Sequence, residues 1–290
     1  MIDAHHHLWD LNAVNYPWLM EKGKRRFFGD PTPIQRNYLI DEHIKLANEL
    51  GFKGSVHIQV GAADGLEEAQ WINSVVNENQ SWPMVQVAFC DLSSDQREVH
   101  LDKLQKLSSV VGVRQIIGRS PAEDANSKTN DLLTSDNFMQ GLQSISDRGL
   151  TFDLQIIPEL LKTCASVFSQ FPNLQVILCH AGSPYNRTLE GIKSWAGNLI
   201  HLSNLSNVSC KLSGLGMFDH NWTGSTVAPI VTTVMDQFGS KRVMFGSNFP
   251  VDSLSSSFEQ LFTRLSSNID EKDFEDVFSK TAQRIYFSNF

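Results

Sequence analysis

The chain has 290 residues, of which 41% are hydrophobic and 19% charged, and its formal net charge is −8. This length and composition are typical of one globular domain with a large core, or at most two domains. The acidic balance disfavours nucleic acid or an anionic membrane as the main partner. No apolar run approaches the roughly 18 to 20 residues that a membrane span requires, and Asp3 with the histidines after it interrupts any signal-peptide core. The four cysteines show no CxxC spacing, so we expect reduced thiols in a cytoplasmic protein.

Short apolar runs rich in β-formers recur along the chain, and each is followed by a longer amphipathic stretch. The runs predict strands at residues 1–7, 55–60, 84–90, 110–117, 150–157, 175–180, 208–212 and 242–245. The amphipathic stretches predict helices at residues 40–50, 66–79, 99–107, 138–147, 158–171, 189–202, 227–238, 258–265 and 273–286.

Strands that alternate with helices imply βαβ units and a parallel sheet. Eight such units in a chain of this length match a (β/α)8 TIM barrel, so we predict an α/β fold in one domain over residues 1–290. A doubly wound open sheet is the alternative, but no Gly-rich phosphate loop follows the first strand. Residues 10–38 form a long segment before the first helix, and we expect this segment to cover the mouth of the barrel.

Histidines stand at the ends of two predicted strands, where barrel enzymes hold their active sites. Side chains alternate along a strand, so His5 and His7 point to one face and His6 to the other. His180 ends the sixth strand, and with His5 and His7 it would provide three imidazoles for one Zn²⁺ with open positions. Taken alone, His180 is equally well explained as a core histidine with a hydrogen-bond partner.

Other side chains on these strands are candidates for substrate binding. Arg114 lies on the fourth strand, where a guanidinium is costly unless it faces an anion, so we predict that it binds a substrate carboxylate. A structural ion pair is the alternative, and Lys211 on the seventh strand has the same two interpretations. Gln59, Trp9 and Trp18 are predicted to shape the pocket, although packing is the commoner fate of tryptophan.

Five segments carry a family resemblance: Ile-Asp-Ala-His-His-His-Leu-Trp at 2–9, Gly-Val-Arg at 112–114, His-Ala-Gly at 180–182, Lys-Leu-Ser-Gly-Leu at 211–215 and Met-Phe-Gly-Ser-Asn-Phe-Pro-Val-Asp at 244–252. With them, the chain resembles the amidohydrolase superfamily, specifically the amidohydrolase-2 branch that includes sugar-acid lactonases and pyrone-dicarboxylate lactonase. The resemblance implies a distorted (β/α)8 barrel in which the strand-1 pair maps to His5 and His7 and the strand-6 histidine to His180. It also implies a strand-8 acid that activates water toward a lactone carbonyl. Metal is not uniformly needed in that branch, so a single divalent metal, with Zn²⁺ favoured, and a metal-independent site both stay open.

The chain departs from the family pattern on strand 8, where the usual Gly-Ser-Asp-Trp-Pro reads Gly-Ser-Asn-Phe-Pro at 246–250. Asn248 cannot take a proton near neutral pH. Three accounts remain: Asp252 is the base; His180 or His5 is the base, while Asn248 orients water or weakly ligates a metal; or hydrolysis has been lost and the site binds or isomerises a lactone. Strand 5 also lacks the lysine that bridges two metals in some amidohydrolases, so no binuclear centre is expected.

The sequence therefore predicts a hydrolase that opens a lactone of a sugar acid or of another small carboxylated ring. The predicted catalytic residues are His5, His7, His180, Asn248 and Asp252. A lactone isomerase or a metal-dependent decarboxylase on the same scaffold is the alternative, and a non-catalytic protein that binds a small ligand is the third hypothesis. Whether the chain forms a homo-oligomer stays open.

Overall fold

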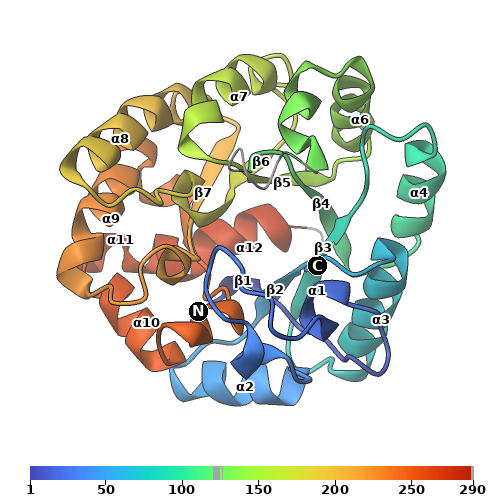
Figure 1. The fold of residues 1–290 in the computed structure, drawn as a ribbon, viewed down its shortest axis with the longest axis horizontal. Helices are drawn as coiled ribbons and strands as arrows, with labels where there is room; N and C mark the ends of the chain where they lie inside the picture. The colour runs from blue at the N-terminus through green and yellow to red at the C-terminus, as the bar shows by residue number, and fades with distance from the viewer. Residues whose placement is uncertain (120–124, 126, 289–290) are drawn as a thin grey trace.

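The computed structural model describes residues 1–119, 125 and 127–288. Eight parallel strands form one sheet in the order of the chain, and helices surround this sheet as a ring (Figure 1). The predicted single-domain (β/α)8 barrel is confirmed. The strands are β1 (Asp3–His6), β2 (Ser55–Ile58), β3 (Met84–Phe89), β4 (Val110–Ile116), β5 (Thr151–Gln155), β6 (Val176–Leu178), β7 (Val208–Leu212) and β8 (Val243–Phe245).

Each predicted helix is present, with ends that shift by a few residues. The segment predicted as a helix at 158–171 begins as a 3-10 turn, Pro158–Leu160, and a π-helical turn, Asp276–Lys280, joins the last two helices. No helix within the described residues is long and apolar enough to span a membrane. The helices are α1 (Pro17–Met20), α2 (Ile40–Glu49), α3 (Gly65–Glu78), α4 (Arg97–Leu104), α6 (Asp136–Asp147), α7 (Leu161–Phe168), α8 (Leu189–Ser203), α9 (Gly224–Phe238), α10 (Phe258–Ser266), α11 (Glu271–Glu275) and α12 (Thr281–Tyr286).

The amino-terminal end of the barrel is closed by α12, which crosses the middle of the ring in Figure 1. Ala282 and Tyr286 of this helix are buried in one apolar cluster with residues of the strands, such as Val56 and Ile177. The backbone N–H of Ile2, just before β1, donates to the carbonyl of Phe278 (2.7 Å). Because apolar side chains fill this end, the polar strand ends gather at the opposite, carboxyl-terminal end.

Strand β1 has one residue more than the matching stretch of β2, because Asp3 pairs with Ser55 and His6 with His57. This bulge changes the side-chain alternation. His6 stacks on His43 of α2, with ring centroids 3.9 Å apart, so it faces away from His5 and His7 as predicted. Asp3 also faces α2, since its carboxylate lies 3.7 Å from Nε2 of His43.

Hydrogen bonds just beyond the end of β8 connect this part of the chain to β1. The backbone N–H of Asn248 donates to the carbonyl of His5 (2.6 Å), and that of His7 donates to the carbonyl of Phe249 (2.7 Å). The carboxylate of Asp3 accepts hydrogen bonds from the backbone N–H (2.8 Å) and Oγ (2.6 Å) of Ser247. These contacts fix the ends of β1 and β8 next to each other.

The segment at 10–38 is not a featureless loop, since it contains α1, a 3-10 turn and an isolated β-bridge between Arg26 and Gly29, and a second bridge joins Tyr38 to Trp9. Its Phe27 ring stacks on Phe218 after β7 at 6.0 Å, and the carbonyl of Phe28 accepts a hydrogen bond from Nε2 of His220 (2.7 Å). These contacts place the segment beside the carboxyl-terminal end of the barrel. Its role as a cover stays a prediction.

Candidate functional site

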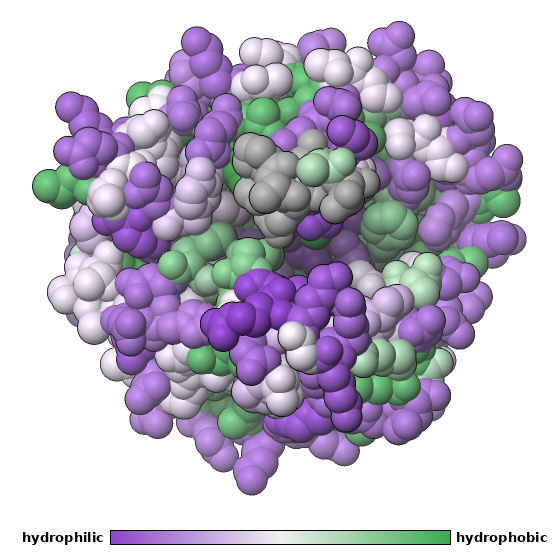
Figure 2. All heavy atoms as spheres, in the orientation of Figure 1, coloured by the Kyte–Doolittle hydropathy of each residue, from purple (hydrophilic) through white to green (hydrophobic). Residues whose placement is uncertain are grey.

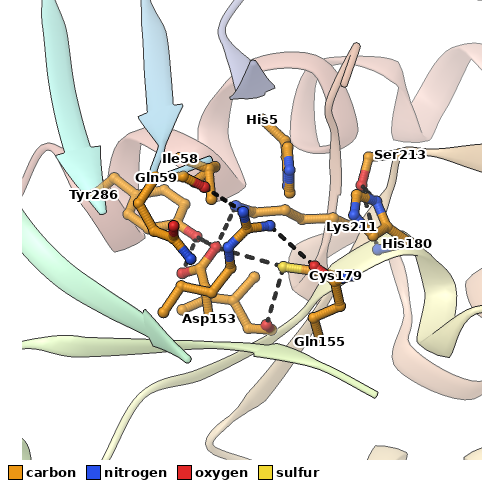
Figure 3. A network of polar contacts seen from close by, with 12 residues as sticks. His5, Ile58, Gln59, Asp153, Gln155, Cys179, His180, Lys211, Ser213 and Tyr286 are labelled. Atoms are coloured by element: carbon orange, nitrogen blue, oxygen red, sulfur yellow. Dashed lines mark hydrogen bonds and ion pairs between the residues drawn. The ribbon is translucent and has the colours of Figure 1, made fainter. Parts of the chain in front are cut away.

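Three histidines meet at the carboxyl-terminal end of the barrel. The ring of His5 lies 4.6 Å from that of His180 and 5.1 Å from that of His7, measured between centroids. All three are buried, and burial lowers the pKa of each imidazole well below its ordinary value. Figure 3 shows His5 and His180 on two sides of Lys211. The neutral rings therefore present nitrogen lone pairs inside the site.

His180 does not belong to a strand, which corrects the prediction of a sixth strand over 175–180. Strand β6 ends at Leu178, and His180 and Ala181 adopt left-handed backbone angles, with φ of 55° and 52°. Such angles cannot continue a strand. The turn brings Nδ1 of His180 within 3.0 Å of Oγ of Ser213 after β7, so one of these atoms donates to the other.

A short chain of side chains links His7 to Asp252. Nδ1 of His7 donates to the carbonyl of Ile58 (2.7 Å), which assigns the neutral tautomer with a lone pair on Nε2. Asn248 donates through Nδ2 to Oδ1 of Asp252 (3.0 Å), so its Oδ1 faces Nε2 of His7 at 3.2 Å. Two hydrogen-bond acceptors, Nε2 of His7 and Oδ1 of Asn248, thus face each other. A positive charge between or beside them would remove the repulsion between their lone pairs.

The carboxyl group of Asp252 is enclosed in the site. Its side chain is buried, and burial raises its pKa to about 7, an effect that the hydrogen bond from Asn248 partly offsets. The second oxygen, Oδ2, is buried and has no hydrogen-bond partner within the described part of the chain. A buried carboxyl group with a pKa near neutrality is suited to accept a proton.

Arg114 lies on β4, and its guanidinium is held by residues at the ends of β2 and β5. Its guanidinium donates to the backbone carbonyl of Gln59 and to Oε1 of Gln155 (3.1 Å), which are both neutral groups. It is buried, and burial lowers its pKa. These hydrogen bonds form no ion pair, but the nearby carboxylates of Asp153 and Glu68 stabilise the charge of Arg114, so both interpretations of this residue stay open. A buried cation held by neutral acceptors remains able to bind an anion.

Two adjoining cavities lie at the carboxyl-terminal end of the barrel. Figure 2 shows a hollow near the centre of the face that is viewed there. One has a volume of about 270 Å³ and is lined by Phe27, Phe218 and Tyr185 beside Gln155. The other, of about 360 Å³, is lined mainly by polar residues, among them Gln59. The cavities share Ile116 and Arg119, so a ligand could have one apolar and one polar side.

Comparison with known proteins assigns the family. A family model described as Amidohydrolase matches residues 2–287. The chain belongs to the amidohydrolase family. It is 32% identical over 266 residues to uncharacterized protein y4mH of Sinorhizobium fredii, covering 90% of this chain and 89% of that protein. It is 22% identical to the L-fucono-1,5-lactonase of Burkholderia multivorans, covering 90% and 85% of the two chains.

The fold of this amidohydrolase is shared with solved structures. A crystal structure of an amidohydrolase from Burkholderia multivorans with bound zinc superimposes with a TM-score of 0.83 at 22% identity, covering 99% of this chain and 98% of that one. At this identity the likeness shows the barrel, and the zinc is a property of the other protein.

The three predicted histidines offer ligand atoms that a divalent metal accepts, but together they do not form a group, among the described residues, whose ligand atoms all lie within 4.8 Å of one another. Both ring nitrogens of His5 are buried and have no hydrogen-bond partner among the described residues. Nε2 of His7 faces an amide oxygen, as described above. Zn²⁺ accepts neutral imidazole nitrogens as ligands. A single ion held by His5, His7 and His180, with Oδ1 of Asn248 as a further neutral ligand, therefore stays a prediction that requires these side chains to reorient toward one another.

Of the five predicted substrate-binding residues, Gln59 lines a cavity, whereas Arg114, Trp9, Trp18 and Lys211 lie outside the lining of both cavities. Trp9 donates from its indole nitrogen to the carbonyl of Arg36 (2.6 Å), and Trp18 donates to that of Val60 (2.7 Å). The two rings pack edge to face at 5.8 Å, and both anchor the segment at 10–38. Lys211 is fully buried beneath the histidines and pairs with Asp153. Contact of these four with substrate stays a prediction.

The sequence reasoning missed the contribution of Tyr286. Its hydroxyl donates to both oxygens of Asp153, at 2.8 and 3.0 Å, from the helix at the far end of the chain. Tyr286 follows Ala282 by one helical turn, a spacing that indicates a shared buried face. No local pattern, however, tells that this face enters the barrel.

Proposed function

We propose that this amidohydrolase hydrolyses a lactone of a sugar acid or of another small carboxylated ring. The observation that carries the proposal is the position of Asp252. Its buried carboxyl group, with a pKa of about 7, is bound to Asn248 next to His7. Asp252 thereby provides the proton acceptor that an asparagine on strand 8 cannot provide. The resemblance to lactonases and the family assignment support the same reaction.

The residues have the following roles in this proposal. Asp252 takes a proton from water through Oδ2, and the water oxygen bonds to the lactone carbonyl carbon. The ester C–O bond then breaks, and the ring oxygen leaves as a hydroxyl that receives the proton. His5 and His180, both neutral, position the carbonyl, and Arg114 binds a carboxylate or ring oxygen. A Zn²⁺ held by His5, His7 and His180 would polarise the carbonyl when bound.

A pH-indicator assay over a panel of sugar-acid lactones and a pyrone dicarboxylate tests the reaction, with His180→Ala as the control. Hydrolysis releases an acid, so acid release that is lost in the variant supports the proposal. If no panel member releases acid, the proposal fails for these classes. Proton NMR of the same mixtures then distinguishes isomerisation, which converts the lactone without acid, from ligand binding without turnover.

Substitution of Gly214 tests the position of His180. Gly214 has a φ of +62°, and a Cβ there would lie 2.3 Å from Nδ1 of His180. We expect Gly214→Ala to displace the imidazole and to lower kcat/KM for the active lactone by about 10²-fold. Gly239 has a φ of +71° with nothing within 4 Å of its Cβ position, so Gly239→Ala controls for backbone strain alone. Equal losses in the two variants would contradict the role of His180.

Removal of the Phe27 ring tests the apolar cavity. Phe27 lines this cavity and stacks on Phe218. A contact between the Phe27 ring and an apolar face of the ligand would contribute about 0.5–1.5 kcal/mol to binding, so we expect Phe27→Ala to raise KM up to roughly tenfold and to leave kcat nearly unchanged. Leu189→Ala, at a position that is 86% exposed on α8, is the matched control. A fall in kcat with unchanged KM would contradict a binding role.

A further inference from the structure

A second group of metal-binding side chains lies inside the barrel, next to the three histidines. His5 of β1, Asp153 of β5 and Cys179 after β6 place their ligand atoms within 4.8 Å of one another, and all three are buried. Imidazole nitrogen, carboxylate oxygen and thiolate sulfur are all ligands of Zn²⁺. His5 has no other partner for its ring nitrogens among the described residues. The three side chains thus have the ligand types and the spacing that a metal ion requires.

The ammonium group of Lys211 already contacts this group of side chains. Nζ of Lys211 lies 2.5 Å from Oδ2 of Asp153, and the ammonium lies 4.9 Å from the centre of the Tyr286 ring. Tyr286 donates to both oxygens of Asp153, and Sγ of Cys179 donates to Oδ2 at 3.7 Å. Figure 3 shows these groups converging on Asp153. The carboxylate is therefore fully used by hydrogen donors.

The balance of buried charge decides which cation fits. Lys211 with Asp153 and a neutral Cys179 thiol has no net charge, and an ion pair without net charge is tolerated in a barrel core. A divalent ion bound by Asp153 and the Cys179 thiolate is equally neutral, with the thiol proton released to solvent. Buried Arg114 acts on Asp153 and Cys179 in either case, so the ion and the ammonium together would add one more uncompensated positive charge beside it, which is costly to bury. The two cations therefore exclude each other.

We propose that the Lys211 ammonium is a built-in cation that takes the place of a metal ion between His5, Asp153 and Cys179. Lys211 then determines which ligands a metal can use in this protein: it keeps sulfur out of the coordination sphere and leaves the histidine nitrogens. The test reads metal coordination rather than turnover, so it is independent of whether lactones are the substrates.

Cobalt(II) titration of the full chain tests the proposal, because a thiolate bound to Co²⁺ gives a sulfur-to-metal charge-transfer band in the near ultraviolet. We expect no such band in the wild-type protein or in Lys211→Arg, which keeps the cation. We expect the band to appear in Lys211→Met and to be lost again when Cys179→Ala is added. Tyr286→Phe is the matched control, since it removes a donor to Asp153 but retains the ammonium.

Two results would overturn the proposal. One is a charge-transfer band in the wild-type protein that Cys179→Ala abolishes, because the ammonium would then not exclude the ion. The other is a folded neutral variant, verified by circular dichroism, that shows no band. Lys211→Gln serves if Lys211→Met does not fold, since its amide can still donate to the buried carboxylate of Asp153.

Discussion

Replacement of Asp252 by asparagine is expected to lower kcat/KM for the active lactone by roughly 10²–10⁴-fold, the usual contribution of a general base. An amide has nearly the same shape and can keep a contact with Asn248, but it cannot accept a proton. Binding should change little, so the loss should appear in kcat rather than in KM. Asp270→Asn, at an exposed carboxylate of which 75% is accessible, is the control.

The pH profile gives a second readout of the same residue. Burial raises the pKa of Asp252 to about 7, and a base works only when it is deprotonated. The wild-type kcat/KM should therefore rise with pH up to about 7 and level off above it. Asp252→Asn should lose this acid limb together with the rate. A variant that keeps both the rate and the limb would move the role of base to a histidine.

Replacement of Asp153 by asparagine is expected to reduce the free energy of unfolding by about 3–5 kcal/mol, as for other buried ion pairs that lose one partner. The Lys211 ammonium would stay buried with no anion, since both side chains are fully enclosed. Urea denaturation followed by circular dichroism measures the loss. Glu275→Gln breaks the exposed pair with Lys280 and should leave the free energy of unfolding nearly unchanged.

A double variant tells whether charge or shape causes the loss. Asp153→Asn with Lys211→Met removes both charges, and neutral replacement of a buried pair is often close to neutral in stability. We expect the double variant to recover most of the stability that Asp153→Asn loses. If the two variants are equally unstable, packing around Asp153 and not the unpaired ammonium is the cause.

The barrel could be predicted from the sequence because each strand is a short apolar run and each helix an amphipathic one. Side-chain period also gave the shared face of His5 and His7. The alternation alone does not give the face of Asp3, because the bulge in β1 between Asp3 and His6 shifts it by one residue. A bulge depends on the pairing partner, and the run of residues in β1 alone does not contain that information.

The sequence could name the histidines that meet at the end of the barrel, but it could not predict the contacts of the candidate site. That Asp252 reaches Asn248 depends on the left-handed backbone of Asn248, with φ of 54°, and on the 3-10 turn that follows it. The sequence left three accounts of this position open because no propensity determines that turn. The pair formed by Asp153 and Tyr286 joins residues 133 positions apart, and only the closed barrel brings them together.

The helix that closes the amino-terminal end of the barrel has a consequence for synthesis on the ribosome. The interior cluster includes Ala282 and Tyr286, and the backbone before β1 is bonded to Phe278. The apolar lining of the earliest strands therefore stays uncovered until nearly the whole chain has emerged. Nascent chains in which α12 has not yet been synthesised should bind chaperones that recognise exposed apolar surface. They should release these chaperones once α12 has docked.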